Sequence, residues 1–154
     1  LNLGYEAMIP SSSLVLINLI QIIRKIMAKF YKDLILKYFK AVDDQDLDSI
    51  LATLHPNCSF SVETHGVKII GQKEIAQMFH RLWRNHKSVK HENFYFVDDA
   101  LNGSIAVRFN VVNELKDGTL VFKSNCNFFT LADNLFLEIR LYMAGENTLN
   151  ALDN

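Results

Sequence analysis

Apolar residues recur at helical spacing in three stretches of the chain, separated by polar and turn-forming residues. The first stretch covers residues 30–42 and has lysines on its other face, so it predicts an amphipathic helix. Asp46 is a good N-cap for a short second helix, and a third helix is predicted over residues 72–84. The apolar positions of these helices are Tyr31, Leu34, Ile35, Tyr38 and Val42, then Leu47, Ile50, Leu51 and Leu54, then Ile75, Met78, Phe79 and Leu82.

The remaining pattern alternates with period two, which predicts strands. Six strands are expected, at residues 58–63, 67–70, 92–97, 104–115, 120–131 and 135–143. Asp, Asn and Gly mark the turns between the last four. Helices followed by a run of long adjacent strands are typical of the α+β class. We therefore expect one α+β domain, in which three helices cover one face of a strongly curved antiparallel or mixed sheet.

The turn at residues 116–118 can close in two ways, and the choice decides which side chains share a face. A two-residue turn at 117–118 pairs Phe109 with Cys126 and gathers the apolar residues of both strands on one face. A three-residue loop with Gly118 in the left-handed conformation gives a mixed apolar and polar face. That face carries Phe109, Val111, Lys123, Asn125 and Asn127. Simple amphipathicity favours the first register, whereas a pocket lining requires the second.

Residues 1–26 stand apart from this pattern. Their apolar run, from Leu14 to Ile23, is about half the length of a membrane span, and its positive charges follow the run instead of preceding it as in a signal peptide. We expect no membrane segment. Either these residues lie outside the domain, which then begins near Met27, or they form a helix that extends the first domain helix and packs against a partner. We favour an extra segment at 1–26, a domain at 27–150 and a tail at 151–154.

Composition excludes several functional classes. At 154 residues, with 49% hydrophobic and 21% charged residues, the chain is ordinary for one globular domain. The net charge of -1 and the scattered basic residues argue against nucleic acid as a partner. Cys58 and Cys126 lack metal-binding spacing, so we expect reduced thiols in a cytoplasmic protein. Because no HExxH motif or Gly-rich phosphate loop occurs, we expect no metal and no cofactor.

Three segments carry a resemblance to a known family. They are YFKAVDDQDLDSILATLHPNCSFSV in the first two helices, THGVKIIGQKEIAQMF before and within the third helix, and FNVVNELKDGTLVFKSNCNFFTL in the long hairpin. In order and spacing they resemble the ketosteroid-isomerase-like, SnoaL-like superfamily, which also includes nuclear-transport-factor-like binding proteins. The resemblance covers residues 30–147 and implies a cone-shaped, cystatin-like α+β barrel with an apolar pocket at its open end. It also favours the three-residue loop at 116–118.

The same resemblance implies candidate catalytic residues. Tyr38 and Asn127 fall at the positions of the two groups that donate hydrogen bonds to a substrate oxygen in ketosteroid isomerase. The position of the catalytic base falls on Val62, which cannot accept a proton. Glu63 beside it and His80 on the third helix are the remaining candidate bases.

The resemblance further implies a ligand pocket lined by Phe60, Val62, Trp83, Phe109, Val111, Asn125 and Met143. Two functions are compatible with such a pocket. One is an isomerase, cyclase or dehydratase acting on an apolar carbonyl or enol compound; the other is a non-catalytic ligand-binding or dimerisation module. The expected partners are a small apolar molecule and a second copy of the chain, because apolar residues occupy both faces of the strand at 120–131.

Overall fold

The structure is a computed structural model, and it describes residues 11–149. Its helices are α1 (Ser11–Asp43), α2 (Leu47–Leu51) and α3 (Gln72–Asn85). Its strands are β1 (Leu54–Val62), β2 (Val67–Ile70), β3 (His86–Asp99), β4 (Ser104–Leu115), β5 (Leu120–Ala132) and β6 (Leu135–Tyr142). Two 3-10 turns, η1 (Glu63–His65) and η2 (Ala100–Asn102), join neighbouring elements.

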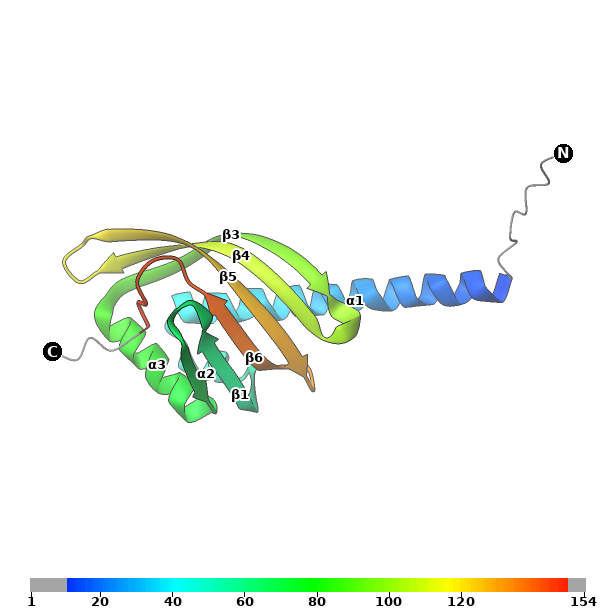
Figure 1. Cartoon of the computed structure of the whole chain (residues 1–154), viewed down its shortest axis with the longest axis horizontal. Coiled ribbons are helices and arrows are strands. Elements are labelled where there is room, and N and C mark those ends of the chain that lie inside the picture. The colour runs from blue at the N-terminus through cyan, green and yellow to red at the C-terminus, as the bar shows by residue number, and fades with distance from the viewer. Residues whose placement is uncertain (1–10, 150–154) are drawn as a thin grey trace.

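The six strands form one sheet in the order β2-β1-β6-β5-β4-β3. All neighbouring pairs are antiparallel except β1 and β6, which are parallel, so the sheet is mixed. In Figure 1 the long strands β3, β4 and β5 arch over the helices, with the second half of α1 behind them and α3 at one end. The expected α+β fold, with a curved sheet and helices on one face, is confirmed.

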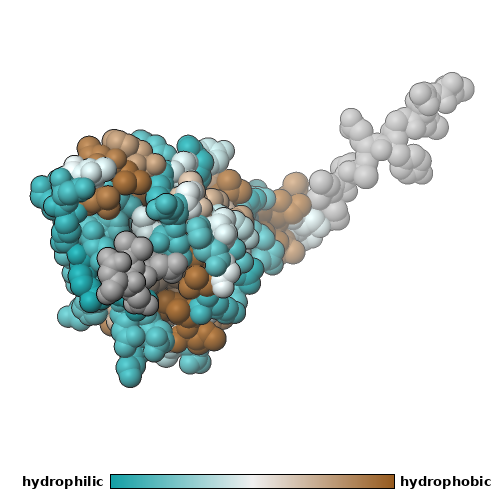
Figure 2. All heavy atoms as spheres, turned by 60° about the vertical axis from the view of Figure 1, so that its left-hand side comes forward, coloured by the Kyte–Doolittle hydropathy of each residue, from teal (hydrophilic) through white to brown (hydrophobic). Residues whose placement is uncertain are grey.

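The second half of α1 is amphipathic as predicted, and Ile35 and Tyr38 lie in the core. Its first half projects beyond the sheet and carries apolar side chains that stay exposed, such as Val15 and Leu16 (Figures 1 and 2). The helix is continuous from Ser11, so residues 11–26 extend the first domain helix. The boundary near Met27 stays a prediction, and the predicted segment at 1–10 and tail at 151–154 lie outside the described residues. No helix within 11–149 is long and apolar enough to cross a membrane.

The hairpin between β4 and β5 closes through a three-residue loop. The Leu115 amide donates to the Thr119 carbonyl at 2.9 Å, and Gly118 has a φ of +88°. Phe109 therefore faces Asn125, the register that produces a mixed lining. Two neighbouring pairs follow the same register, Val107 with Asn127 and Val111 with Lys123. The second of the two predicted registers is confirmed.

Two strand starts differ from the prediction. β1 begins at Leu54 instead of residue 58, because Leu54 pairs with Phe136 of β6 across an irregular stretch that includes Pro56. β3 begins at His86 instead of residue 92, because its first residues pair with the far end of β4. In both segments polar residues hide the alternation, and long-range pairing determines the strand.

Candidate functional site

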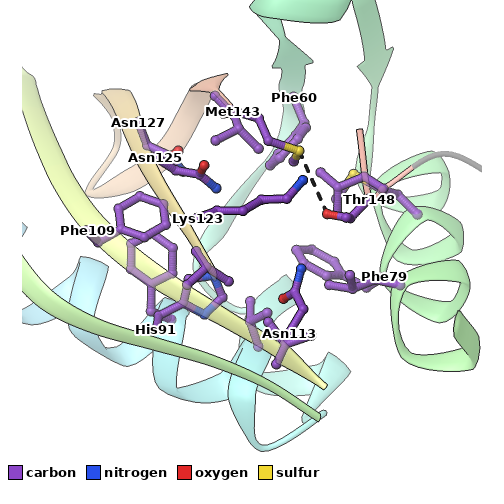
Figure 3. Close-up of a pocket in the computed structure, with 18 of the residues that line it drawn as sticks. Phe60, Phe79, His91, Phe109, Asn113, Lys123, Asn125, Asn127, Met143 and Thr148 are labelled. Carbon is purple, nitrogen blue, oxygen red and sulfur yellow. Dashed lines mark hydrogen bonds between the residues drawn. The ribbon is translucent and has the colours of Figure 1, made fainter. Parts of the chain in front are cut away.

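A cavity of about 50 Å³ lies between the concave face of the sheet and the helices α1 and α3. That space holds only a few water molecules. The lining is mostly apolar and aromatic, with a polar group of side chains from β4 and β5 (Figure 3). The lining residues include Tyr38, Phe39, Val42, Phe60, Met78, Phe79, Leu82, His91, Phe109, Val111, Asn113, Lys123, Asn125, Asn127, Leu141, Met143, Thr148 and Leu149.

The polar part of the lining follows β5, where alternate residues point into the cavity. Lys123 extends across it (Figure 3). Its ammonium donates to the backbone carbonyl of Glu146. Asn125 accepts a hydrogen bond from the Ala144 amide at 3.0 Å. Asn127 is almost fully buried, and its carboxamide oxygen has no hydrogen-bond partner among the described residues. A buried polar atom without a partner costs about 1–3 kcal/mol, so this residue needs a reason beyond packing.

A histidine–carboxylate pair lies at the edge of the same cavity. Asp43, the last residue of α1, is 2.5 Å from His91 Nδ1 through its Oδ1 atom. Its other oxygen accepts the His91 backbone amide at 2.9 Å. The imidazole packs on Phe39 and Phe109, with ring centroids 4.6 and 5.4 Å away. Both carboxylate oxygens therefore fix one histidine, while its Nε2 has no partner within residues 11–149.

The prediction missed both members of this pair. The predicted strand begins at residue 92, one residue after His91, and the predicted first helix ends at residue 42, one residue before Asp43. One signal was available in the sequence. A carboxylate in the last turn of a helix is unfavourable beside the negative end of the helix dipole, so Asp43 required a compensating partner. The sequence could not identify that partner, because it lies on a strand 48 residues further along.

Tyr38 lies deep in the same cavity, among Phe39, Phe79, Phe129 and Phe136. Burial raises the pKa of its hydroxyl far above the ordinary value, and the nearby Cys58 raises it further. The hydroxyl therefore keeps its proton at any physiological pH and is available as a hydrogen-bond donor.

Not all of the residues expected in the site lie in this cavity. Those that line it are Tyr38, Phe60, Phe109, Val111, Asn125, Asn127 and Met143. The others, Glu63, His80, Val62 and Trp83, lie outside its lining.

Each residue outside the lining has a clear place elsewhere. Glu63 lies in the turn η1, where it accepts a hydrogen bond from Ser61 at 2.5 Å, because β1 ends before it and no bulge turns it inward. His80 is on the exposed face of α3. Val62 is packed in the core. The Trp83 indole donates to the Val42 carbonyl at 3.1 Å.

Other titratable groups do not form a second site. Among the described residues, no group of three or more His, Cys, Asp or Glu side chains could hold a metal ion. Cys58 and Cys126 are both free thiols, and burial raises the pKa of Cys58 to about 12. Neither thiol lines the cavity, whose titratable lining residues are Tyr38, His91 and Lys123.

Comparisons with known proteins identify the fold. No family model and no curated protein matches the sequence. A proposed polyketide cyclase from Xanthomonas campestris pv. campestris is similar in structure, with a TM-score of 0.69, 15% identity, and coverage of 74% of this chain and 90% of that one. An NTF2-like protein of unknown function from Exiguobacterium sp. 255-15 is similar with a TM-score of 0.64, 15% identity, and coverage of 73% and 99%.

A third similar structure is that of SalBIII, an epoxide hydrolase/cyclase-like enzyme of pyran ring formation in the polyether salinomycin. Its TM-score is 0.66, with 18% identity and coverage of 73% of this chain and 89% of that one. Together these likenesses show that the chain has the SnoaL-like, NTF2-like fold expected from the sequence. At such identities they establish the fold alone.

Proposed function

We propose that this chain is a small-molecule enzyme that catalyses proton transfer, of isomerase, cyclase or dehydratase type, on a compound bound in the cavity. The observation that carries this proposal is the His91–Asp43 pair at the cavity wall. Histidine is the side chain that acts most often as a general acid or base in enzymes, and a carboxylate on Nδ1 orients it for that role. Such a pair is unfavourable in a purely structural role, because the Asp43 carboxylate lies at the C-terminus of α1, beside the negative end of the helix dipole.

The hydrogen bonds assign the tautomer of His91. A carboxylate can only accept, so Nδ1 carries the proton that it shares with Asp43, and Nε2 has its lone pair free. In the proposed reaction Nε2 removes a proton from the substrate and later returns it to another atom or to a leaving group. Asp43 stabilises the imidazolium that forms between these steps, without taking the proton itself.

The developing negative charge on a substrate oxygen requires hydrogen-bond donors. Tyr38 and Asn127 line the same cavity, and each brings a donor that stays protonated at neutral pH. We assign them the role of polarising a carbonyl or enol oxygen, as expected from the resemblance. His91 takes the place of the base for which the sequence offered only Glu63 and His80.

The similar structures support this class of chemistry without establishing it. SalBIII is named as an epoxide hydrolase/cyclase-like enzyme, and several other similar structures are named as proposed polyketide cyclases. One observation favours the competing function, a non-catalytic binding module: the cavity of about 50 Å³ is small for a substrate. The segment that carries Thr148 and Leu149 also lines it, so a larger ligand requires this segment to move.

Hydrogen–deuterium exchange tests the proposal. The chain is incubated in D₂O with a panel of enolisable aryl ketones, and loss of the α-proton signal is followed by NMR. We expect accelerated exchange with at least one ketone, reduced by Tyr38→Phe, Asn127→Ala and His91→Gln. A rate equal to the buffer rate for every ketone would favour the binding module, and normal rates in all three variants would overturn the roles assigned to these residues.

We also propose that the chain forms a homodimer through the outer face of the sheet. Phe122, Phe128 and Tyr142 are exposed there, and the rings of the last two meet edge to face with centroids 5.7 Å apart. Clusters of exposed aromatic side chains on a sheet favour association. A second copy is the occupant that the resemblance implies, and sedimentation measures it directly.

A cytoplasmic location is part of the same proposal. Cys58 and Cys126 are both free, as expected where thiols stay reduced. Localisation of a tagged full chain tests it.

A further inference from the structure

His91 and Lys123 lie in one row across the sheet. His91 on β3 pairs with Val111 on β4, and Val111 pairs with Lys123 on β5. All three line the cavity, so their side chains share the concave face. Since neighbouring strands are about 4.8 Å apart, the Cα atoms of His91 and Lys123 are roughly 10 Å apart, enough for one aromatic ring between their side chains.

Lys123 lacks a carboxylate partner among the described residues. Its ammonium donates to the Glu146 backbone carbonyl, and the Glu146 carboxylate attracts it only from a longer distance. Burial lowers the pKa of Lys123, so the surrounding protein holds this charge at a cost. Four other lysines in residues 11–149 have such partners, for example Lys87 with Glu114 at 2.6 Å, but none of the four lines the cavity. A cation directed into an apolar cavity without an anion is arranged for an anion that comes from outside.

Asn113 provides a second, independent observation. It is next to Val111 on the same face of β4, is 2% exposed, and its carboxamide oxygen has no partner among residues 11–149. Asn127, on the other side of Lys123 along β5, is in the same condition. Two buried acceptors and one unmatched cation thus surround the cavity (Figure 3). A ligand that satisfies them carries a negative group and at least one hydrogen-bond donor.

We propose that the substrate is an unsaturated or aromatic carboxylate bearing a hydroxyl group, and that Lys123 binds its carboxylate. The carboxylate replaces the Glu146 carbonyl at the ammonium. The apolar body lies along Val111 and Phe109, and the hydroxyl donates to Asn113 or Asn127. This arrangement places the body of the ligand beside His91 and explains why a mostly apolar cavity contains a lysine. The inference rests on the proposed function of the site and gives its substrate class.

Matched pairs of small ligands test the inference. The full chain is titrated with 4-hydroxycinnamate and with its uncharged amide, 4-hydroxycinnamamide, followed by ligand-observed NMR. Lys123→Met removes the charge at nearly constant volume, and Lys116→Met on the exposed hairpin loop is the matched control. We expect the carboxylate to bind at least about tenfold more tightly than the amide, as typical for one charge-assisted hydrogen bond. This preference should disappear in Lys123→Met and persist in Lys116→Met.

Equal binding of acid and amide, or no binding of the acid at about 1 mM, the weak end of specific association, overturns the inference. So does an unchanged preference in Lys123→Met. Asn113→Leu and Asn127→Leu give a separate reading, because at least one of them should weaken 4-hydroxycinnamate but leave cinnamate, which lacks the hydroxyl, unaffected. Binding is measured without turnover, so a failed carboxylate preference leaves proton exchange by His91 intact. Conversely, if the proposed reaction is wrong, the preference for the carboxylate over the amide should still be observed, and it should persist in His91→Gln.

Discussion

Between residues 122 and 128, the two faces of β5 carry the opposite of what burial usually selects. Lys123, Asn125 and Asn127 point into the cavity, and the two asparagines are 6% and 3% exposed. Phe122 and Phe128 point outward and are 71% and 49% exposed. In most strands with one buried face the apolar side chains are inside. Here a one-residue change of register would have restored the usual pattern, and the loop at 116–118 prevents it.

This difference indicates that neither face of β5 serves stability alone. The buried amide of Asn127 leaves an acceptor without a partner among residues 11–149, and the exposed rings leave apolar area in water. Both arrangements cost free energy of folding. Functional sites are where proteins retain such costs. The comparison therefore supports both proposals, that the inner face binds a ligand and that the outer face binds a second copy of the chain.

The largest expected effect is on the free energy of unfolding, which should depend on whether the substituted aromatic residue lies on the inner or the outer face. Phe109→Ala removes a fully buried ring and should lower the free energy of unfolding by about 3–5 kcal/mol. Phe122→Ala removes an exposed ring and should change that free energy by less than about 0.5 kcal/mol in the dilute monomer. Chemical denaturation of both variants measures the difference. If both variants lost a similar free energy of unfolding, the inner and outer faces would not differ in burial as described.

The next effect concerns association. Phe122→Glu introduces a charge into the proposed contact, and a desolvated charge without a partner should raise the dimer dissociation constant about 100-fold or more. Sedimentation velocity over a range of concentrations measures the constant, and Lys116→Glu on the hairpin loop is the control. If the unaltered chain is a monomer at micromolar concentration, the outer face does not bind a second copy.

A smaller effect tests the cost of the polar lining. Asn127→Leu replaces an unsatisfied amide with an apolar side chain of similar size, so it should raise the free energy of unfolding by about 1 kcal/mol. The same substitution at Asn110, on the outer face of β4, should give no gain. Thermal and chemical unfolding of both variants check the prediction. A loss of stability in Asn127→Leu would show that the carboxamide is satisfied.

The smallest effect is kinetic and concerns the two thiols. Burial raises the pKa of Cys58 to about 12, so near pH 8 only about one molecule in ten thousand carries its reactive thiolate. Cys126 is less buried and should react first with iodoacetamide, followed by mass spectrometry of the peptides. As the pH rises toward 12 the thiolate fraction of Cys58 rises, and the difference in rate should narrow. Faster modification of Cys58 at pH 8 would contradict this account.

Much of the fold was predictable because its local signals agree. The apolar stripe of α3 predicted Ile75, Met78, Phe79 and Leu82 as its buried side, and all four are buried. Asp46 accepts a hydrogen bond from the Ser49 amide at 3.0 Å, as expected of an N-cap. The starts of β1 and β3 were not predictable, because their polar residues become strands only through pairing with distant partners.

The site was predictable only in part, for a physical reason. Tyr38, Asn125 and Asn127 were found through resemblance and the correct register, and the cavity contains all three. The candidate bases Glu63 and His80 were chosen by proximity in the chain and by residue type, and both lie outside the cavity lining. His91 and Asp43 become a pair only when the end of α1 packs against β3, and no spacing in a sequence expresses that contact.

The most direct test of the central claim is a double-mutant cycle on this pair. The rate of α-proton exchange of an enolisable ketone in D₂O is measured for Asp43→Asn, His91→Gln and the double variant. His80→Gln, on the exposed face of α3, is the control. If the two residues act as one acid–base unit, each single change lowers the rate about 100-fold or more, and the double variant is no slower than the slower single variant. Independent, multiplying effects, or a normal rate in His91→Gln with the fold intact, would contradict proton transfer by this pair.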